Sequence, residues 1–539
     1  MIKIKSNRNV IIVTCFLLIC FNLFAQTDTE TNSLSEENLQ TENIDKSLQK
    51  NFVILENIAN HTLNPHITSL SSDSQILTGL YEGLFSYDPI SLEPCFAIAK
   101  EYKISRDKKR WTFTLRDDAF FSNGEKITAN DVKKSWIKLL ATPTAPYASL
   151  LYVIQGAKEF SESKISSDEV KITVNSENSF SIVLNKPASY LPRLLCHSAF
   201  SVVNEDLSIS SGAFYLASDN KNEIILKKNK FYWDERNTNL EQITFIQSDD
   251  PNESSHLFNN GDVDWICGSV NTTILLNPST FVVSGEFGTA YLFFKIHEDS
   301  KNNWLNRDFR NALMEAVPWD DLRDGYMIKA DTFVYPLQNY PSVNGFSYTD
   351  EQASIQMMDE ARKKYNVPKT KILDLTLDIS ENGYSDEKLN LLKNAWQKLG
   401  VNLIVNRVNP YEYFAKAHTS SADMLSYVWI GDYADPLAFL ELFRSDSSLN
   451  DSGWKNKEFD DLLDEASLAS AENRYSILAK AENILLDDAM VLPMYHPIAI
   501  NIIDLDCVGG WASNPFDLHP LKYIFKKEVK TKIQNVVKK

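Results

Sequence analysis

The stretch "RWTFTLRDDAFFSNGEKITANDVKKSW" (Arg110 to Trp136) holds a strand, a turn and the start of a helix, in an order that decides the fold class. "WTFTLR" alternates apolar and polar side chains, as a half-buried strand does. "SNG" (Ser122 to Gly124) has the composition of a turn. Thr128 and Asp131 have the spacing of a helix capping box. The pattern predicts a strand followed by a helix that begins after Thr128.

The same alternation of strand and helix signals continues along the chain. "QITFIQSDDPNESSHLFNNGDVDWICG" (Gln242 to Gly268) indicates strand, helix and strand, and "AYLFFKI" (Ala290 to Ile296) indicates a buried strand. With 539 residues the chain is too long for one ordinary core. We therefore expect several α/β domains, with a ligand site in the crevice between them.

Composition narrows the class of protein. Hydrophobic residues make up 43% of the chain and charged residues 23%, which is typical of a soluble globular protein. The net charge of -18 disfavours binding to nucleic acid or to anionic lipid surfaces. It is compatible with a soluble carrier of neutral or cationic ligands.

The first 25 residues have the pattern of an export signal. A basic start precedes an apolar run from Val10 to Ala25, and cleavage is expected after Ala25. The alternative is a lipoprotein signal at Cys20, but Ile19 stands where a small residue would be needed. Residues 26–50 are polar and predict a flexible leader. The protein is therefore expected in the periplasm or another extracytoplasmic compartment.

Four cysteines would remain after cleavage, and their spacing indicates neither a disulfide framework nor a zinc site. One disulfide is possible in an oxidising compartment, but the sequence does not choose a pair. The four are Cys95, Cys196, Cys267 and Cys507.

Catalytic motifs are missing from the sequence. It contains no G-x-S-x-G, H-E-x-x-H, Walker A loop or G-x-G-x-x-G, and its eight histidines are scattered. We expect no enzyme activity, metal or cofactor, although a triad built from distant residues stays open. "YVWIGDYADP" (Tyr427 to Pro436) carries two carboxylates, Asp432 and Asp435, beside aromatic residues. They could serve a turn, a catalytic pair, a metal or a bound cation.

Taken in order, several segments resemble the periplasmic oligopeptide- and dipeptide-binding proteins of ABC importers, family 5 of the extracytoplasmic solute-binding proteins. The resemblance covers roughly residues 51–526, and its most diagnostic part is the opening stretch, Arg110 to Trp136. The other segments are "TLNPHITSLSSDSQILTGLYEGLFSYDP", "SGAFYL", "NKFYWDE", "LFNNGDVDW", "LNRDFRNALMEAV", "AWQKLGVNL", "VWIGDYADPLAFL" and "VLPMYHPIAI".

The resemblance implies an α/β, two-lobed periplasmic binding protein of class II type, cluster C, with three domains. The ligand would be buried between hinged lobes. Domain I would be discontinuous, over residues 51–82, 205–289 and 501–539. Domain II would span residues 83–204, and domain III residues 290–500.

The resemblance also implies the ligand-binding residues. Asp432 would bind the free α-amino group of a peptide held extended through its backbone. Trp429 would form a pocket wall, and Gly431 would let backbone approach the ligand. Tyr433 and His197 are further candidates. The alternatives are a turn aspartate at 432, a core aromatic at 429, a packing role for Tyr433 and an ordinary partly buried His197.

Three departures from the family pattern leave the ligand open. Ser426 stands where members that dock a peptide carboxylate can carry arginine, and Lys295 stands where an acidic residue is expected. "DWICGSV" (Asp264 to Val270) lacks the tyrosine–asparagine pair that contacts peptide backbone. Peptide length and carboxylate docking are therefore not fixed by the resemblance.

The predicted function is capture of short peptides by a monomer, which delivers them to the permease and ATPase complex of an ABC importer. Within the same fold, the alternatives are a nickel chelate, haem, an oligosaccharide or a signalling peptide. In other classes, the alternatives are a secreted hydrolase and a surface adhesin or chaperone-like factor.

Overall fold

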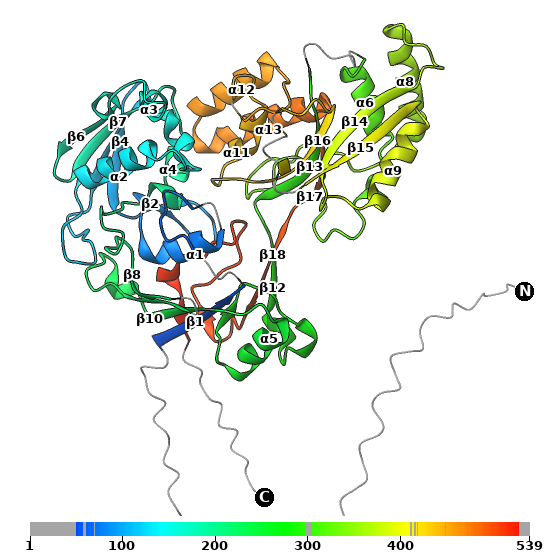
Figure 1. The fold of residues 1–539 in the computed structure, drawn as a ribbon. Coiled ribbons are helices and arrows are strands. Elements are labelled where there is room, and N and C mark those ends of the chain that lie inside the picture. Colours follow the sequence, from blue (N-terminus) through cyan, green and yellow to red (C-terminus); the bar gives the residue numbers. More distant parts are fainter. Residues whose placement is uncertain are drawn as a thin grey trace, which may run out of the picture. The chain divides into compact units, whose positions relative to one another are not determined.

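The computed structural model describes residues 50–57, 61–68, 71–220, 223–297, 304–409, 412–413, 417, 419–447 and 449–527. The predicted export signal, the alternative anchor at Cys20 and the predicted leader up to residue 49 lie outside this part. Within it, the strands form three main sheets with helices packed against them (Figure 1). A search of these residues finds no helix that is long and apolar enough to cross a membrane.

The first sheet combines strands that lie far apart in the sequence. Its central strand, β1, runs parallel to both of its neighbours, β10 and β11. Helix α1 (Ser71–Leu80) contacts β8, and α5 (Pro251–Asn260) contacts β11. In spatial order the seven strands are β12 (Phe281–Gly285), β18 (Ile498–Ile503), β11 (Trp265–Ile266), β1 (Asn51–Glu56), β10 (Gln242–Gln247), β9 (Glu223–Lys228) and β8 (Phe214–Asp219).

The second sheet contains the stretch that opened the sequence analysis. It is antiparallel, and α2 (Ala129–Ala141) packs beside it. The predicted capping box is confirmed: Asp131 N–H donates to the Thr128 side chain, and Thr128 N–H donates to the Asp131 carboxylate. Helices α3 (Ala157–Ser161) and α4 (Leu191–Leu194) follow. The four strands in spatial order are β4 (Ala99–Ile104), β5 (Arg110–Leu115), β7 (Ser179–Val183) and β6 (Ile172–Ser176).

The third sheet positions the candidate site. Its central strand β16 runs antiparallel to β13 and parallel to β14. In spatial order its strands are β15 (Val401–Val408), β14 (Leu373–Ser380), β16 (Met424–Ile430), β13 (Gly288–Phe294) and β17 (Val491–Tyr495). Its helices are α6 (Arg307–Glu315), α7 (Trp319–Leu322), α8 (Glu351–Lys364), α9 (Asp386–Gln397), α11 (Leu437–Leu440), α12 (Lys457–Leu468) and α13 (Ala471–Asp487).

Two chain crossings connect the first sheet to the third. One leads from β12 to β13, and the other leads from β17 to β18. They are held side by side, because Glu286 N–H donates to the carbonyl of Pro497 at 2.8 Å. Strand β13 begins before residue 290 and β18 begins before residue 501, so each crossing lies slightly upstream of the predicted boundary. The domain boundaries themselves stay a prediction.

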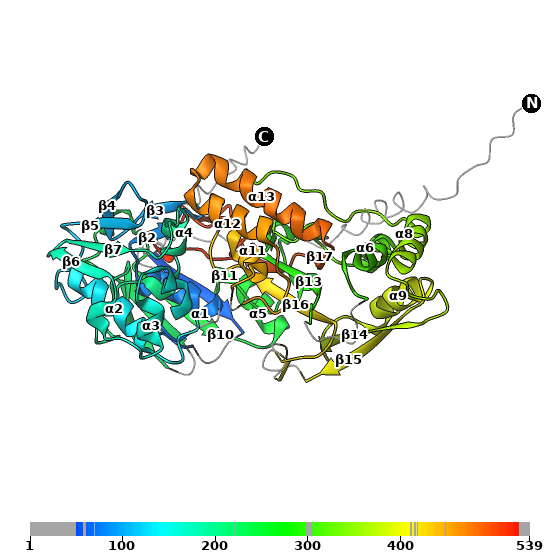
Figure 2. The same ribbon diagram turned by 90° about the horizontal axis from the view of Figure 1, so that it is seen from above.

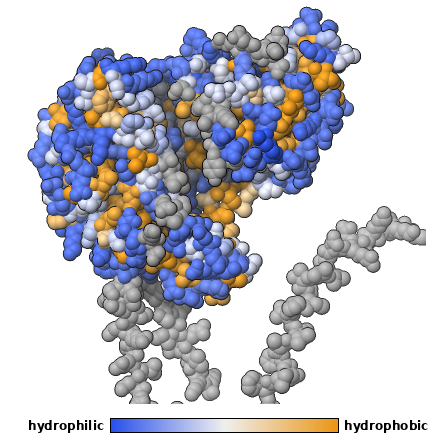
Figure 3. Space-filling model, viewed as in Figure 1, coloured by the Kyte–Doolittle hydropathy of each residue, from blue (hydrophilic) through white to orange (hydrophobic). Residues whose placement is uncertain are grey.

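The lobe with the second sheet touches the lobe with the third sheet along one side. Figures 1 and 2 both show α11 and α12 beside α4. Ser189 N–H donates to the carbonyl of Ser467 at 3.3 Å, and Arg193 donates to the carbonyl of Ala434 at 3.2 Å. Two further sheets have two strands each: β2 (Phe85–Tyr87) pairs with β3 (Pro94–Phe96), and β19 (Val508–Gly509) pairs with β20 (Phe525–Lys526). The surface is hollowed between these two lobes (Figure 3).

Candidate functional site

Strand β16 has one edge that is only partly paired. Strand β14 pairs with it at Met424 and Leu425, at the beginning of β16. From Ser426 onward, β13 is the partner of β16 within the part of the chain that the structure describes. An unpaired strand edge presents backbone N–H and C=O groups to an incoming chain.

The register shows which backbone groups lie on this edge. Gly431 N–H donates to the carbonyl of Phe287 at 2.8 Å, and Lys295 N–H donates to the carbonyl of Asp423 at 2.8 Å. Hydrogen-bonded pairs alternate in an antiparallel ladder, so the odd-numbered residues of β16 bond to β13. The N–H and C=O groups of Val428 and Ile430 therefore point to the other edge. Among the described residues, nothing bonds to them there.

The edge is closed at Ser426 by a tyrosine. The Tyr413 hydroxyl donates to the carbonyl of Ser426 at 2.8 Å and accepts its N–H at 3.0 Å. The open part of the edge therefore extends from Val428 to the end of the strand, where Asp432 follows.

Asp432 lies at the end of the open edge and has a carboxylate that the fold does not use. The side chain is half-buried, and it makes no hydrogen bond or ion pair with the residues described. Burial raises the pKa of its carboxyl to about 6. A charged carboxylate without a partner in a partly desolvated site is unfavourable in free energy. This group is therefore suited to bind a cation that belongs to a ligand.

One ring from the opposite lobe, that of Tyr147, lies near Asp432. Burial, with the charge of Asp432 as a second cause, raises the pKa of Tyr147 to about 12. The rings of Tyr147 and His197 lie 4.2 Å apart. Burial lowers the pKa of His197 to about 4, and its Nδ1 accepts the N–H of Ala199 at 3.1 Å. Tyr147 was missed from the sequence, because its segment shows only turn composition.

The other predicted residues of this segment divide between cavity lining and packing. Trp429 lines a cavity, and its Nε1 donates to the carbonyl of Ala438 at 2.9 Å. Gly431 is buried, and a Cβ there would clash with the ring of Phe287. Tyr433 is 6% exposed and stacks on Tyr190, with the ring centroids 5.6 Å apart. Packing therefore accounts for Gly431 and Tyr433.

Asp435 differs from Asp432 because its carboxylate is fully occupied. Both of its oxygens accept hydrogen bonds from Arg474 at 2.8 Å, and both side chains are buried. One oxygen also accepts the N–H of Leu437 at 3.0 Å. Asp435 thus forms a structural ion pair with Arg474, which lies on α13.

Lys295 is also engaged within the fold. Its Nζ donates to the carbonyls of Ala417 and Ser420 at 3.1 and 3.0 Å, and burial lowers its pKa. The side chain is 7% exposed. It therefore anchors the segment before β16.

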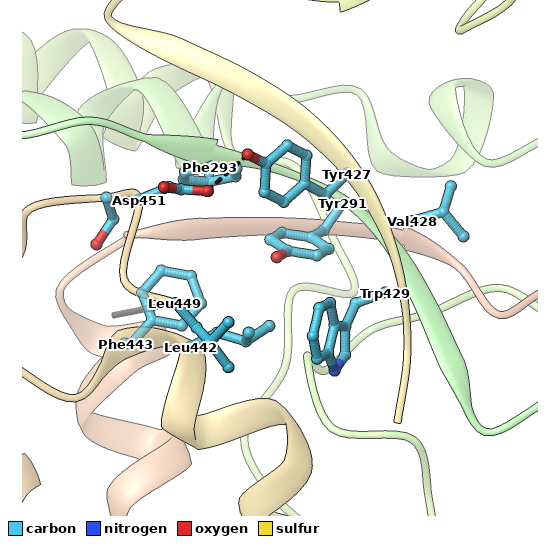
Figure 4. Close-up of a pocket in the computed structure, with 10 residues that line it drawn as sticks. Tyr291, Phe293, Tyr427, Val428, Trp429, Leu442, Phe443, Leu449 and Asp451 are labelled. Carbon is cyan, nitrogen blue, oxygen red and sulfur yellow. Dashed lines mark hydrogen bonds between the residues drawn. The ribbon is translucent and has the colours of Figure 1, made fainter. Parts of the chain in front are cut away.

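An aromatic cavity lies on one face of β16 (Figure 4). Its volume is about 170 Å³. The Tyr427 hydroxyl donates to Asp451 at its rim at 2.7 Å. Further walls come from β16 itself, from β13 and from the segment after α11, namely Trp429, Tyr291, Phe293, Leu442, Phe443 and Leu449.

A second, tyrosine-rich pocket also borders β16 at Ser426 and Val428. Its volume is about 490 Å³, and its walls include Tyr326, Tyr384, Tyr413, Tyr495 and Lys388. Lys388 Nζ donates to the carbonyls of Asp321 and Asp324, both at 2.7 Å. The aromatic cavity and this pocket therefore flank the open edge of β16.

The described residues offer no cluster of three or more His, Cys, Asp or Glu side chains that could hold a metal ion. The four cysteines outside the predicted export signal are all free thiols in the structure.

Comparisons with known proteins give a consistent result. The family model described as bacterial extracellular solute-binding proteins, family 5 Middle, matches residues 93–451. The dipeptide-binding protein DppE of Bacillus subtilis is 25% identical over 84% of this chain and 87% of its own length. The periplasmic oligopeptide-binding protein OppA of Salmonella typhimurium is 26% identical over 87% of this chain and 90% of its own.

Solved structures share the fold. The unliganded open form of the periplasmic murein tripeptide-binding protein MppA matches with a TM-score of 0.75 at 23% identity, over 89% of this chain and 97% of that one. Haemophilus influenzae OppA in complex with RPPGFSPFR matches with a TM-score of 0.64 at 22% identity, over 89% and 99%. The predicted two-lobed α/β fold is confirmed by these matches.

Proposed function

Because the chain belongs to the bacterial extracellular solute-binding proteins of family 5, we propose that it captures short peptides between its lobes and delivers them to an ABC importer. The observation that carries the proposal is the unpaired Asp432 carboxylate at the end of the open β16 edge. Relatives named as dipeptide- and oligopeptide-binding proteins support this choice of ligand.

The peptide binds as an added strand. Its backbone exchanges hydrogen bonds with Val428 and Ile430, whose groups point to the open edge. These bonds involve only backbone atoms of the peptide and do not depend on its side chains. Peptides of different sequence can therefore bind. The Tyr413 hydroxyl at Ser426 ends the pairing, which suits a short ligand.

The free amine of the peptide pairs with Asp432. The carboxylate lacks a partner in the described part of the chain, and Tyr147 approaches it from the opposite lobe. A charged amine supplies the missing partner and offsets the cost of the buried charge. The ligand therefore enters with its amino terminus at the end of β16 and runs antiparallel to that strand.

Delivery follows from closure of the lobes. The two crossings between the first and third sheets provide a hinge, and closure removes the ligand from water. The monomer then presents its closed form to the permease and ATPase complex outside the cytoplasm. The protein carries out no chemistry on the peptide.

The test is calorimetry with the tripeptide Ala-Leu-Ala and its N-acetylated form. The free peptide is expected to bind, and acetylation should weaken binding by about 2–5 kcal/mol because it leaves the Asp432 charge unpaired. Equal affinities would reject the amine site, and no binding by either form would reject the peptide function.

Binding should also depend on pH. The Asp432 carboxyl has a raised pKa of about 6, and only its charged form pairs with an amine. Affinity for Ala-Leu-Ala should therefore fall below pH 6, approaching about tenfold per pH unit. His197 and Tyr147 do not change charge between pH 5 and 8, since their pKa values are about 4 and about 12. Calorimetry at pH 5, 6 and 7 measures this, and a flat profile contradicts it.

A further inference from the structure

Two cavities of different chemistry flank the open edge of β16. The aromatic cavity is walled mainly by aromatic and apolar side chains, with Asp451 and Ser452 also lining it, whereas the tyrosine-rich pocket contains Lys388 and more polar groups. We propose that the second residue of the bound peptide, counted from its free amine, carries a large apolar side chain that fills the aromatic cavity. This inference rests on the proposed function, because it uses the added-strand geometry.

The cavities open on opposite faces of the strand. Trp429 lines only the aromatic cavity, where Tyr291 and Phe293 of β13 also lie, whereas Tyr427 and Val428 border both cavities. Ser426 lines only the tyrosine-rich pocket, together with Tyr495 of β17. Successive side chains of a strand alternate between faces. An added strand therefore sends neighbouring side chains into different cavities.

The register fixes which ligand residue meets which cavity. With its amine at Asp432, the first peptide residue lies opposite Ile430, where backbone groups are open. The second residue then lies opposite Trp429 and the third lies opposite Val428. Directly opposite residues of an antiparallel pair project to the same face. The second side chain thus enters the aromatic cavity, and the third enters the tyrosine-rich pocket.

The chemistry of the aromatic cavity selects an apolar occupant. Its volume of about 170 Å³ admits one large side chain. The carboxylate at its rim, Asp451, already accepts the Tyr427 hydroxyl at 2.7 Å. An apolar side chain gains by leaving water there, whereas an acidic one would lose hydration beside Asp451.

The tyrosine-rich pocket has a different selectivity. It is larger, at about 490 Å³, and polar groups contribute to its walls. The third residue is therefore expected to tolerate polar side chains.

The first test is calorimetry with Ala-Xaa-Ala tripeptides. Leucine or phenylalanine at the second position should bind roughly tenfold or more tightly than alanine, from the apolar area buried. Aspartate there should bind more weakly than alanine. Equal affinities across this series would overturn the inference. The inference would also be overturned if Leu-Ala-Ala or Ala-Ala-Leu bound more tightly than Ala-Leu-Ala. Tightest binding of Ala-Lys-Ala within the series would overturn it as well.

The second test narrows the cavity from its rim. Leu449 is 44% exposed, so Leu449→Trp should fold normally while reducing the space. It should lower the affinity for Ala-Leu-Ala by roughly tenfold more than it lowers the affinity for Ala-Ala-Ala. The matched control is Leu505→Trp, at a leucine that is 42% exposed near β18, which should change neither affinity. Equal losses for both peptides, or no loss for either, would contradict the inference.

The failures of the two proposals can be told apart. If no tripeptide binds, or if N-acetylation has no effect, the proposed function fails. If binding depends on the free amine but not on the second side chain, only the inference about the aromatic cavity fails.

Discussion

Asp432→Asn is expected to weaken binding of Ala-Leu-Ala at pH 7 by about 2–5 kcal/mol, because the peptide amine would lose its charged partner. Since about 1.4 kcal/mol corresponds to tenfold, the dissociation constant should rise by a factor of roughly 30 or more. Asparagine keeps the size of the side chain and removes only its charge. Calorimetry on the wild-type protein and the variant measures the effect.

The same substitution should not destabilise the fold. Burial raises the pKa of Asp432 to about 6, above the ordinary value of 3.8. A carboxyl with a higher pKa in the folded protein than in the unfolded chain has a cost in stability that grows as the pH rises above the ordinary value and is complete above the raised value. At pH 7 the asparagine variant should therefore unfold at the same urea concentration as the wild type, or at a higher one.

A cycle of four measurements separates pairing from indirect effects. The wild type and Asp432→Asn are each measured with free and with N-acetylated Ala-Leu-Ala. If the amine pairs with Asp432, the two changes are strongly non-additive, and acetylation has little further effect in the variant. Additive losses would mean that the two groups do not interact, and the proposed amine site would be wrong.

Local signals were sufficient to predict the elements. The strand at Arg110 and the helix after Thr128 follow from alternation and capping, which involve neighbours in the sequence. The two-lobed fold was implied by the family resemblance, which rests on the order of many such segments. Its hinge could be placed only within a few residues, because β13 and β18 begin slightly before the predicted boundaries.

The roles of the site residues depend on partners that are distant in the sequence. Asp432 and Asp435 stand three residues apart, and their local sequence does not show which one is free. The difference arises because Arg474 on α13 takes both oxygens of Asp435. In the same way, the hydroxyl that closes the edge at Ser426 belongs to Tyr413. Such pairings follow from tertiary packing and leave no periodic signal.

Asp435→Ala should mainly lower the stability of the fold, whereas Asp432→Asn should mainly weaken peptide binding. The Asp435 and Arg474 side chains are 1% and 4% exposed, so the substitution leaves a guanidinium buried without its carboxylate. Burial alone would lower the pKa of Arg474, but the charge of Asp435 raises it, in keeping with a strong pair. Removing one partner of a buried pair costs about 3–5 kcal/mol of unfolding free energy. Urea denaturation measures this loss.

The matched control is the double variant Asp435→Ala with Arg474→Met. Removing both charges takes away the uncompensated guanidinium, so the double variant should recover much of the stability that the single variant loses. Peptide affinity, measured where each protein is folded, should fall less in Asp435→Ala than in Asp432→Asn, because Asp435 faces α13 and not the open edge. If instead Asp435→Ala keeps its stability and loses the dependence on a free amine, the two carboxylates have been assigned the wrong way round.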